Sequence, residues 1–449
     1  MRRREFLKTT LSMMAAVGVA PDLLRAAELT QLPLGDVSFD KSVYEKNQPQ
    51  TLAIYLVGGM GDIVGNMTHL EQIRKEDLSA KPYPSSGFTM TKDGFWQEGG
   101  GASLQNILDN ADYQATYFRT AYDRSLQRSH GRAQRRWMHG HPTIFSGMPI
   151  TLMHVLNRYN AVDENTLMPY VRLAGGLQFY DDEGASFPLP SHLRPVTIEI
   201  PHYSNEVMTN PYKRNSIWDD ANVEEAIEKL SYEVNDYGDP ITSAMQQRGK
   251  ISDFIEKLKN DPLPGGVEYP THRTGKIIET AMRILIGNPD TKVITTEPGN
   301  RWDDHSNALT GHQLHASQLF EAIEVAMKHM KAAGRDNINI VVFGDFGRNF
   351  NINKANGWDH GNNQVVYWFG GARYLNNLGI VGETKLYVWS KKARLYTRPV
   401  EDGFTFEPYS IAATFYGIYG IKNPEVLTGG HGIIGPSSHL PSKQPFLKV

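Results

Sequence analysis

The sequence contains no cysteine, and that absence removes several kinds of chemistry. With no Cys among its 449 residues, the chain has no disulfide framework, no thiolate nucleophile, no Cys-ligated zinc and no iron–sulfur cluster. Any metal ion must therefore be held by His and carboxylate side chains. The 15 His residues make such a site possible.

The chain also lacks a basic excess and a long apolar run. Lys and Arg number 46 against 49 Asp and Glu, a net charge of −3, so we expect no nucleic-acid partner. No apolar stretch approaches the roughly 20 residues that a membrane-spanning helix needs. We therefore expect no transmembrane domain, unless the N-terminal leader stays uncleaved as an anchor.

The N-terminus has the features of an export signal. Residues 2–8 (RRREFLK) are strongly basic, and residues 9–20 are moderately apolar and rich in small side chains. The Arg-Arg-x-Phe-Leu-Lys order is similar to the twin-arginine signal. We predict a signal peptide over residues 1–27, although Arg25 fits the usual cleavage rule badly. The prediction makes the protein periplasmic or extracellular, with the twin-arginine translocase as its partner during export.

The middle of the chain predicts an α/β fold. Amphipathic patterns, clearest over residues 311–333, alternate with short apolar runs that are typical of buried strands. This alternation predicts a mostly parallel sheet with helices on both faces. The apolar runs are residues 51–57, 114–122, 291–296, 337–343 and 364–369.

Residues 180–290 have a different composition. A Pro-rich stretch is followed by charged helical patterns near residues 219–232 and 251–259. We interpret this segment as a helical and loop insertion, or a cap, on the sheet and not as a separate domain.

Carboxylates and imidazoles follow the predicted strands. Because the carboxyl ends of parallel strands meet at one edge of a sheet, these side chains are expected to converge there. Asp and His are ligands for zinc and other divalent ions, although each alone is also a common turn or cap residue. The candidates are Asp62 after Gly58-Gly59, Asp303, Asp304 and His305, Asp345 before Arg348, and Asp359 with His360.

A second dense segment, residues 128–141, follows the predicted strand at 114–122. Its Ser129 would stand at the start of a helix, where an exposed hydroxyl beside a metal ion can act as a nucleophile. The alternative is that Ser129 caps the helix while the nearby arginines form a solvated face. The sequence leaves both interpretations open.

These motifs together carry a family resemblance. Gly58-Gly59 with Asp62, Arg128-Ser129-His130, Trp302-Asp303-Asp304-His305, Asp345-Phe346-Gly347-Arg348 and Asp359-His360-Gly361 resemble the bacterial domain-of-unknown-function 1501 family. That family is grouped with the alkaline phosphatase/sulfatase-like superfamily. The resemblance spans about residues 51–375, with a looser match near 410–421. It implies one alkaline-phosphatase-like domain over residues 28–449, a three-layer α/β/α sandwich.

The resemblance also implies roles for individual residues. It makes Ser129 the nucleophile of a phosphoryl- or sulfuryl-transfer site, and arginines such as Arg128, Arg132 and Arg348 are candidates to clamp the oxygens of the transferring group. The ions would be zinc, manganese, magnesium or calcium. The implied metal ligands are Asp62, Asp303, His305, Asp359 and His360.

Three positions depart from the family pattern. Gly61 stands where the family has Asp, Asp345 where it has Glu, and Asn362-Asn363 where it has a further His. His431 is the candidate substitute for that His. The sequence therefore supports two hypotheses: an exported metal-dependent hydrolase of small phosphate or sulfate esters, or a non-catalytic exported binding or assembly protein on a degenerate phosphatase-like fold.

Overall fold

The computed structural model describes most of the chain after residue 33. The described residues are 34–76, 82–125, 128–143, 146–174, 189–201, 206–212, 240–298, 302–389, 394–435 and 437–448. The predicted signal peptide and the helix expected near residues 219–232 lie outside these ranges. Among the described helices, none is both long enough and apolar enough to cross a membrane.

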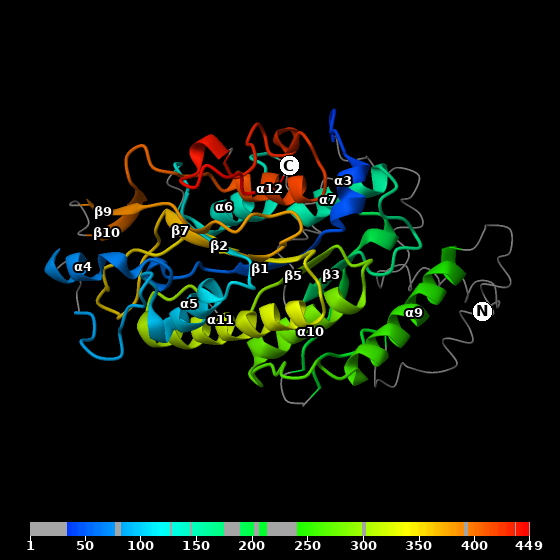
Figure 1. Cartoon of the computed structure of the whole chain (residues 1–449), viewed down its shortest axis with the longest axis horizontal. Coiled ribbons are helices and arrows are strands. Elements are labelled where there is room, and N and C mark those ends of the chain that lie inside the picture. The colour runs from blue at the N-terminus through cyan, green and yellow to red at the C-terminus, as the bar shows by residue number, and fades with distance from the viewer. Residues whose placement is uncertain are drawn as a thin grey trace, which may run out of the picture.

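An eight-stranded sheet runs through the described part of the molecule, in the order β4-β3-β5-β1-β6-β7-β2-β8 (Figure 1). β7 pairs antiparallel with both of its neighbours, and the other pairs are parallel. Seven strands therefore share one direction and β7 runs against them. The strands are β1 (Gln50–Leu56), β2 (Ala115–Tyr122), β3 (Tyr170–Leu173), β4 (Val196–Ile198), β5 (Val293–Thr296), β6 (Ile338–Gly344), β7 (Asn363–Gly370) and β8 (Gly379–Val381).

A separate antiparallel hairpin, β9 (Thr384–Trp389) and β10 (Arg394–Pro399), follows β8. The helices are α3 (Lys41–Asn47), α4 (Leu70–Glu76), α5 (Gly101–Asp109), α6 (His130–Gln134), α7 (Met148–Arg158), α9 (Pro240–Asn260), α10 (Arg273–Gly287), α11 (Ala308–Ala332) and α12 (Tyr409–Ile418). Short helical turns are η1 (Asp62–Val64), η2 (Met67–His69), η3 (Gln97–Gly99), η4 (Arg135–His139), η6 (Ser191–Leu193), η8 (Pro424–Val426) and η9 (Ser437–His439).

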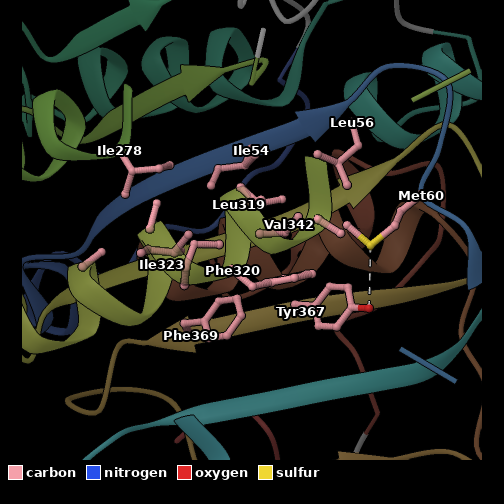
Figure 2. Close-up of a cluster of buried hydrophobic side chains, with 14 of the residues drawn as sticks. Ile54, Leu56, Met60, Ile278, Leu319, Phe320, Ile323, Val342, Tyr367 and Phe369 are labelled. Carbon is pink, nitrogen blue, oxygen red and sulfur yellow. Dashed lines mark hydrogen bonds between the residues drawn. The ribbon is translucent and has the colours of Figure 1, made fainter. Parts of the chain in front are cut away.

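The central strands are buried on both faces, which is why their sequences are continuously apolar. Side chains of a strand alternate between the two faces. Thus Ile54 of β1 packs in the core that α5, α10 and α11 cover, whereas Tyr55 packs in the core beneath α7 and α12. Figure 2 shows the first core, in which Leu319 and Ile323 of α11 lie against the sheet.

The predicted fold class is confirmed. Helices cover both faces of a mostly parallel sheet, so the fold is an α/β sandwich of three layers (Figure 1). The five predicted strands correspond to β1, β2, β5, β6 and β7. The sequence analysis missed β3, β4 and β8, which have only three or four residues and lack a longer apolar run around them such as β5 has.

The predicted insertion over residues 180–290 is described in part. It contributes the edge strand β4 and the helix α10. The apolar face of α10, with Ile277 and Ile278, packs in the same core as α11. This helix therefore belongs to the layer that covers the sheet, while the outer limits of the insertion and of the single domain remain predictions.

Candidate metal centre

The Asp and His residues predicted at strand exits meet at one edge of the sheet. Asp303 and His305 come after β5, and Asp345 comes directly after β6. His360 precedes β7, but β7 runs against β6, so its beginning lies beside the end of β6. α6, which follows β2, begins with His130 and adds an imidazole at the same edge.

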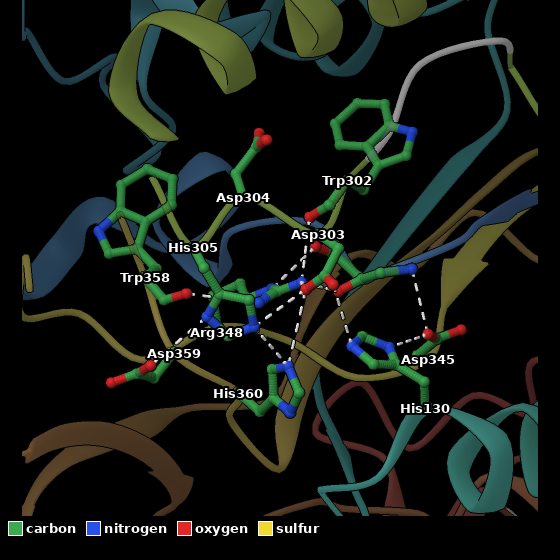
Figure 3. Close-up of polar contacts among 12 residues, drawn as sticks. His130, Trp302, Asp303, Asp304, His305, Asp345, Arg348, Trp358, Asp359 and His360 are labelled. Carbon is green, nitrogen blue, oxygen red and sulfur yellow. Dashed lines mark hydrogen bonds and ion pairs between the residues drawn. The ribbon is translucent and has the colours of Figure 1, made fainter. Parts of the chain in front are cut away.

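Four of these side chains converge on one point (Figure 3). His305 Nε2 lies 2.9 Å from His360 Nε2 and 3.2 Å from Asp303 Oδ1. His360 Nε2 lies 3.6 Å from that same oxygen, and His130 Nε2 lies 3.3 Å from Asp303 Oδ2. The four donor atoms all lie within 4.8 Å of one another. We call these four residues the four-donor cluster.

The dimensions of the four-donor cluster fit a single ion. In a tetrahedral site with metal–ligand distances of about 2.0–2.1 Å, the donor atoms lie about 3.3–3.4 Å apart. Four of the distances between donor atoms run from 2.9 to 3.6 Å, and all donor atoms of the cluster lie within 4.8 Å of one another. Two neutral imidazole nitrogens facing each other repel unless a proton or a cation lies between them. Three nitrogens and one carboxylate suit zinc or another transition metal better than magnesium or calcium, which prefer oxygen ligands.

The other ring nitrogen of each imidazole faces an acceptor. An acceptor at Nδ1 keeps the proton there, so the Nε2 lone pair points into the cluster. Histidines that bind metal ions are usually held in this way. The contacts are His130 Nδ1 with the Asp345 carboxylate (2.6 Å), His360 Nδ1 with the Arg128 carbonyl (2.7 Å) and His305 Nδ1 with the Asp359 carboxylate (3.4 Å).

Arg348 is buried below the site and forms hydrogen bonds that connect its loops. Its guanidinium is buried and donates to Asp303 Oδ1 at 2.5 Å. It also donates to backbone carbonyls of three separate segments, those of Gly58 and Gly59, of Trp302 and of Trp358. This placement favours a positioning role for Arg348 over contact with a substrate.

The protonation of the cluster follows from burial and from these partners. Burial lowers the pKa of His360 to about 4, and the nearby charge of Arg348 acts in the same direction. Burial raises the pKa of Asp303, but the hydrogen bond and charge of Arg348 together with the charges of His130 and His305 outweigh it, so the net shift is downward. The bond to Asp345 raises the pKa of His130 against the effect of burial. At neutral pH, His360 and Asp303 are therefore in the forms that bind a cation.

Gly58 and Gly59 allow the loop after β1 to approach the site closely. Both residues have positive φ, +105° and +81°. A Cβ on Gly58 would lie 2.3 Å from the backbone nitrogen of Asp303, and one on Gly59 would lie 1.9 Å from the carbonyl oxygen of Phe346. Neither position has room for a side chain, and the positive φ also disfavours one.

Arg128 lies beside the cluster, where its own carbonyl accepts the hydrogen bond from His360. The centre of its guanidinium lies 4.5 Å from the Tyr396 ring centroid and 5.0 Å from that of Trp389. It donates to the Tyr396 hydroxyl at 3.1 Å and to Asn362 Oδ1 at 2.8 Å. Because these partners are neutral, the arginine keeps a charge that can attract an anion.

The structure separates two of the predicted ligands from the four-donor cluster. One carboxylate oxygen of Asp359 faces Nδ1 of His305, on the side of the ring away from the four-donor cluster. The other oxygen forms an ion pair with Arg394 at 2.7 Å. Asp62 is buried and accepts hydrogen bonds from Thr397 and Asn363. Burial raises its pKa to about 7, against the effect of those bonds.

The remaining candidates lie as follows. Ser129 is the N-cap residue of α6, with an exposed side chain that makes no capping hydrogen bond. Arg132 is exposed on α6. His431 lies against the ring of Tyr409, with centroids 4.4 Å apart, and is not one of the four donors.

The resemblance assigned no role to His130 or Asp345, although Asp345 was among the carboxylates expected at the strand ends. Both stood in motifs that it singled out, since His130 follows Arg128-Ser129 and Asp345 begins the segment that ends in Arg348. The usable signal was the position of His130 after a predicted strand.

The fold and the four-donor cluster define an α/β protein with a candidate site for one divalent ion. The family model described as "Protein of unknown function (DUF1501)" matches residues 277–425. The resemblance to that family is thereby confirmed over this part of the chain, which contains Asp303, His305 and His360. No curated protein matches the sequence.

Several solved structures are similar to the chain at low identity. A protein in the alkaline phosphatase superfamily from Vibrio parahaemolyticus has 10% identity and a TM-score of 0.37, with 93% of this chain and 79% of that chain covered. A phosphonate monoester hydrolase from Silicibacter pomeroyi has 10% identity and a TM-score of 0.34, covering 85% and 76%. A sulfatase from Pseudoalteromonas sp. has 10% identity and a TM-score of 0.33, covering 86% and 73%.

Proposed function

We propose that the chain is an exported, metal-dependent hydrolase of phosphate or sulfate esters. The observation that carries the proposal is the convergence of three imidazole Nε2 atoms on the Asp303 carboxylate, with an acceptor behind each imidazole. His130, Asp303, His305 and His360 would hold the ion. Asp359 would orient the ring of His305 through Nδ1 and would not bind the ion itself.

A bound divalent ion lowers the pKa of an attacking hydroxyl or water and neutralises negative charge on the transferring group. The chain's own residues supply the rest. Arg128 stands beside the cluster with neutral hydrogen-bond partners, so it is suited to bind the oxygens of a phosphate or sulfate group. Arg348 fixes the orientation of Asp303.

The cluster is open on one side. The side chains of His305 and Asp303 are 46% and 40% exposed, whereas that of His360 is 19% exposed. A substrate oxygen could therefore approach an ion held by these residues from solvent. Ser129 is the proposed nucleophile because its exposed hydroxyl belongs to the residue next to His130.

One observation favours a second candidate function. Four protein donors are typical of a structural zinc site, whereas a catalytic site usually has three and keeps one position open. A non-catalytic exported protein that uses the ion to hold its fold or to bind a partner is consistent with that donor count. The localisation in either case is periplasmic or extracellular, and the translocase is the expected partner during export.

Metal analysis combined with an activity assay tests the proposal. The purified protein is expected to hold about one zinc or similar ion per chain and to hydrolyse an aryl phosphate or aryl sulfate. His360→Ala should lose the ion and the activity together, because the cluster has no other imidazole to replace the ligand. His439→Ala is the matched control, since His439 is exposed on η9 and outside the cluster.

Three outcomes separate the candidates. Bound metal with hydrolysis supports the hydrolase. Bound metal without hydrolysis of either ester class supports the non-catalytic protein. A wild-type chain that binds no divalent ion contradicts both.

A further inference from the structure

Asp345 is a fully buried carboxylate at the edge of the site. It is 0% exposed, and burying a carboxylate is costly unless hydrogen bonds replace the lost water. Tyr55 donates its hydroxyl to Oδ1 at 2.5 Å, and the backbone N–H of Gly58 donates to Oδ2 at 3.1 Å. Gln134 also donates to Oδ2, at 3.3 Å. The carboxylate is therefore held from β1, from the loop after β1 and from α6.

The remaining hydrogen-bond partner of the Asp345 carboxylate is His130, one of the candidate metal ligands. His130 Nδ1 lies 2.6 Å from Asp345 Oδ2, while His130 Nε2 points to Asp303 Oδ2 at 3.3 Å. The chain of contacts thus runs from Tyr55 in the core to Asp345, from there to His130, and from His130 to Asp303. Figure 3 shows the part from Asp345 through His130 to Asp303.

The position of His130 depends on the contact with Asp345 more than the positions of His305 and His360 depend on any single contact. It stands at the first position of α6, a helix of only five residues, and its side chain is 31% exposed. His305 and His360 belong to loops that Arg348 fastens through the backbone of Trp302 and Trp358. The ring of Phe346 packs against that of His130 at a centroid distance of 4.9 Å, but such packing does not fix which nitrogen carries the proton.

The three acceptors behind the imidazoles also differ in strength. His360 faces a neutral backbone carbonyl, that of Arg128. His305 faces Asp359 at 3.4 Å, and that carboxylate is shared with Arg394. Asp345 makes the shortest of the three contacts, 2.6 Å, and no Lys or Arg pairs with it among the ion pairs of the described residues.

We propose that Asp345 is a positioning residue for the metal ligand His130. The Asp345 carboxylate accepts a hydrogen bond from the Nδ1–H of His130, and this directs the Nε2 lone pair into the four-donor cluster. The negative charge of Asp345 also makes the imidazole a stronger metal ligand. Tyr55 and Gly58 hold the carboxylate in place. This inference rests on the proposed metal function and names a residue outside the ligand set that controls metal affinity.

The test measures the zinc dissociation constant by competition with a chromophoric chelator. Asp345→Asn keeps the size of the side chain but removes its charge, and it should weaken zinc binding about 10- to 100-fold, as is usual when such a partner of a ligating histidine is changed. Tyr55→Phe leaves Asp345 in place and should weaken binding only several-fold.

A double-mutant cycle separates positioning from a general structural effect. In a His130→Ala background, Asp345→Asn should leave zinc affinity nearly unchanged, because the side chain that it orients is gone. An equal loss in both backgrounds would overturn the proposal, as would unchanged affinity in Asp345→Asn. If Asp345→Asn does not fold, the cycle is run with Tyr55→Phe, and the same two outcomes decide.

The wild-type measurement keeps the two proposals apart. Zinc binding by the wild type together with unchanged binding by Asp345→Asn contradicts only the positioning role. The absence of zinc binding by the wild type contradicts the proposed function, and the positioning role with it.

Discussion

The Nε2 atoms of His305 and His360 lie 2.9 Å apart, although 55 residues separate them along the chain. His305 comes after β5 and His360 before β7, two strands that are not neighbours in the sheet. Asp303 and His130 complete the group around them.

Zinc should stabilise the folded protein. A ligand that binds only the folded state adds about 2.7 kcal/mol of stability when its free concentration is 100 times its dissociation constant. We expect the melting temperature in differential scanning calorimetry to rise when zinc is added to metal-free protein and to fall back when a chelator is added. An unchanged melting temperature across that titration would contradict the metal site.

Arg348→Lys should destabilise the protein and disturb the site. Lysine cannot reproduce the donors that reach Asp303 and the carbonyls of three segments, so buried acceptors lose their partners. We expect a loss of about 3–5 kcal/mol in the free energy of unfolding, measured with urea. Arg132→Lys, on the exposed face of α6, is the control and should stay within about 0.5 kcal/mol of the wild type.

Gly58→Ala should separate the loop after β1 from the Asp303 loop. The new methyl group would lie 2.3 Å from the backbone nitrogen of Asp303, and φ is +105°. Lower stability and weaker zinc binding should therefore occur together. Gly131→Ala is the matched control on α6, where a Cβ meets nothing within 4 Å, and it should be neutral or slightly stabilising. Equal zinc affinity in the two variants would show that the close contact between Gly58 and the Asp303 backbone does not affect the site.

The buried Asp62 should make stability depend on pH. Its pKa in the folded state is about 7, above the value of 3.8 that applies when it is exposed, so the folded state binds the proton more tightly. Its contribution is fully present below about pH 4 and is lost as the pH rises to about 7. At about 1.4 kcal/mol per pKa unit, the loss amounts to about 4 kcal/mol.

Asp62→Asn provides the comparison, because an amide does not titrate. The difference in the free energy of unfolding between the variant and the wild type, measured with urea, should move in favour of the variant between pH 4 and pH 7. A difference that stays constant over that range would show that Asp62 is not held in its neutral form.

Ser129→Ala distinguishes a nucleophile from a helix cap. Because the hydroxyl makes no capping hydrogen bond and is exposed, its removal should cost less than the ~1 kcal/mol typical of a lost cap. If Ser129 attacks the substrate, turnover of an aryl phosphate or sulfate should be abolished at an unchanged melting temperature. Full activity in this variant would exclude Ser129 and point to water as the nucleophile.

The sequence was sufficient to predict the sheet and part of the cluster. Strands buried on both faces have continuous apolar patterns, and the residues that follow them must meet at one edge, which placed Asp303 and His305 near His360. The pattern could not show that Asp359 faces the back of His305, because neighbouring side chains point in different directions and the chain turns there.

Two further misses also have physical reasons. The burial of Asp62 depends on Thr397, which is 335 residues away along the chain, so no local pattern reports it. The anchoring of His130 depends on Asp345, at a separation of 215 residues. Contacts of this kind depend on how the strands are ordered in the sheet, and a single sequence does not reveal that order.

The reversed direction of β7 has a consequence for when an ion can bind. The donors come from three separate points of the chain, which are His130, the loop with Asp303 and His305, and His360. They meet only after β2, β5, β6 and β7 have taken their places. In the unfolded chain, the two of the three imidazoles that are nearest in sequence, His305 and His360, are 55 residues apart. No short loop therefore contains two of the imidazole ligands, and the ion cannot start folding as it does in a zinc finger. We therefore expect the ion to bind after the sheet has assembled, so the ions available to the folded chain determine which one it acquires.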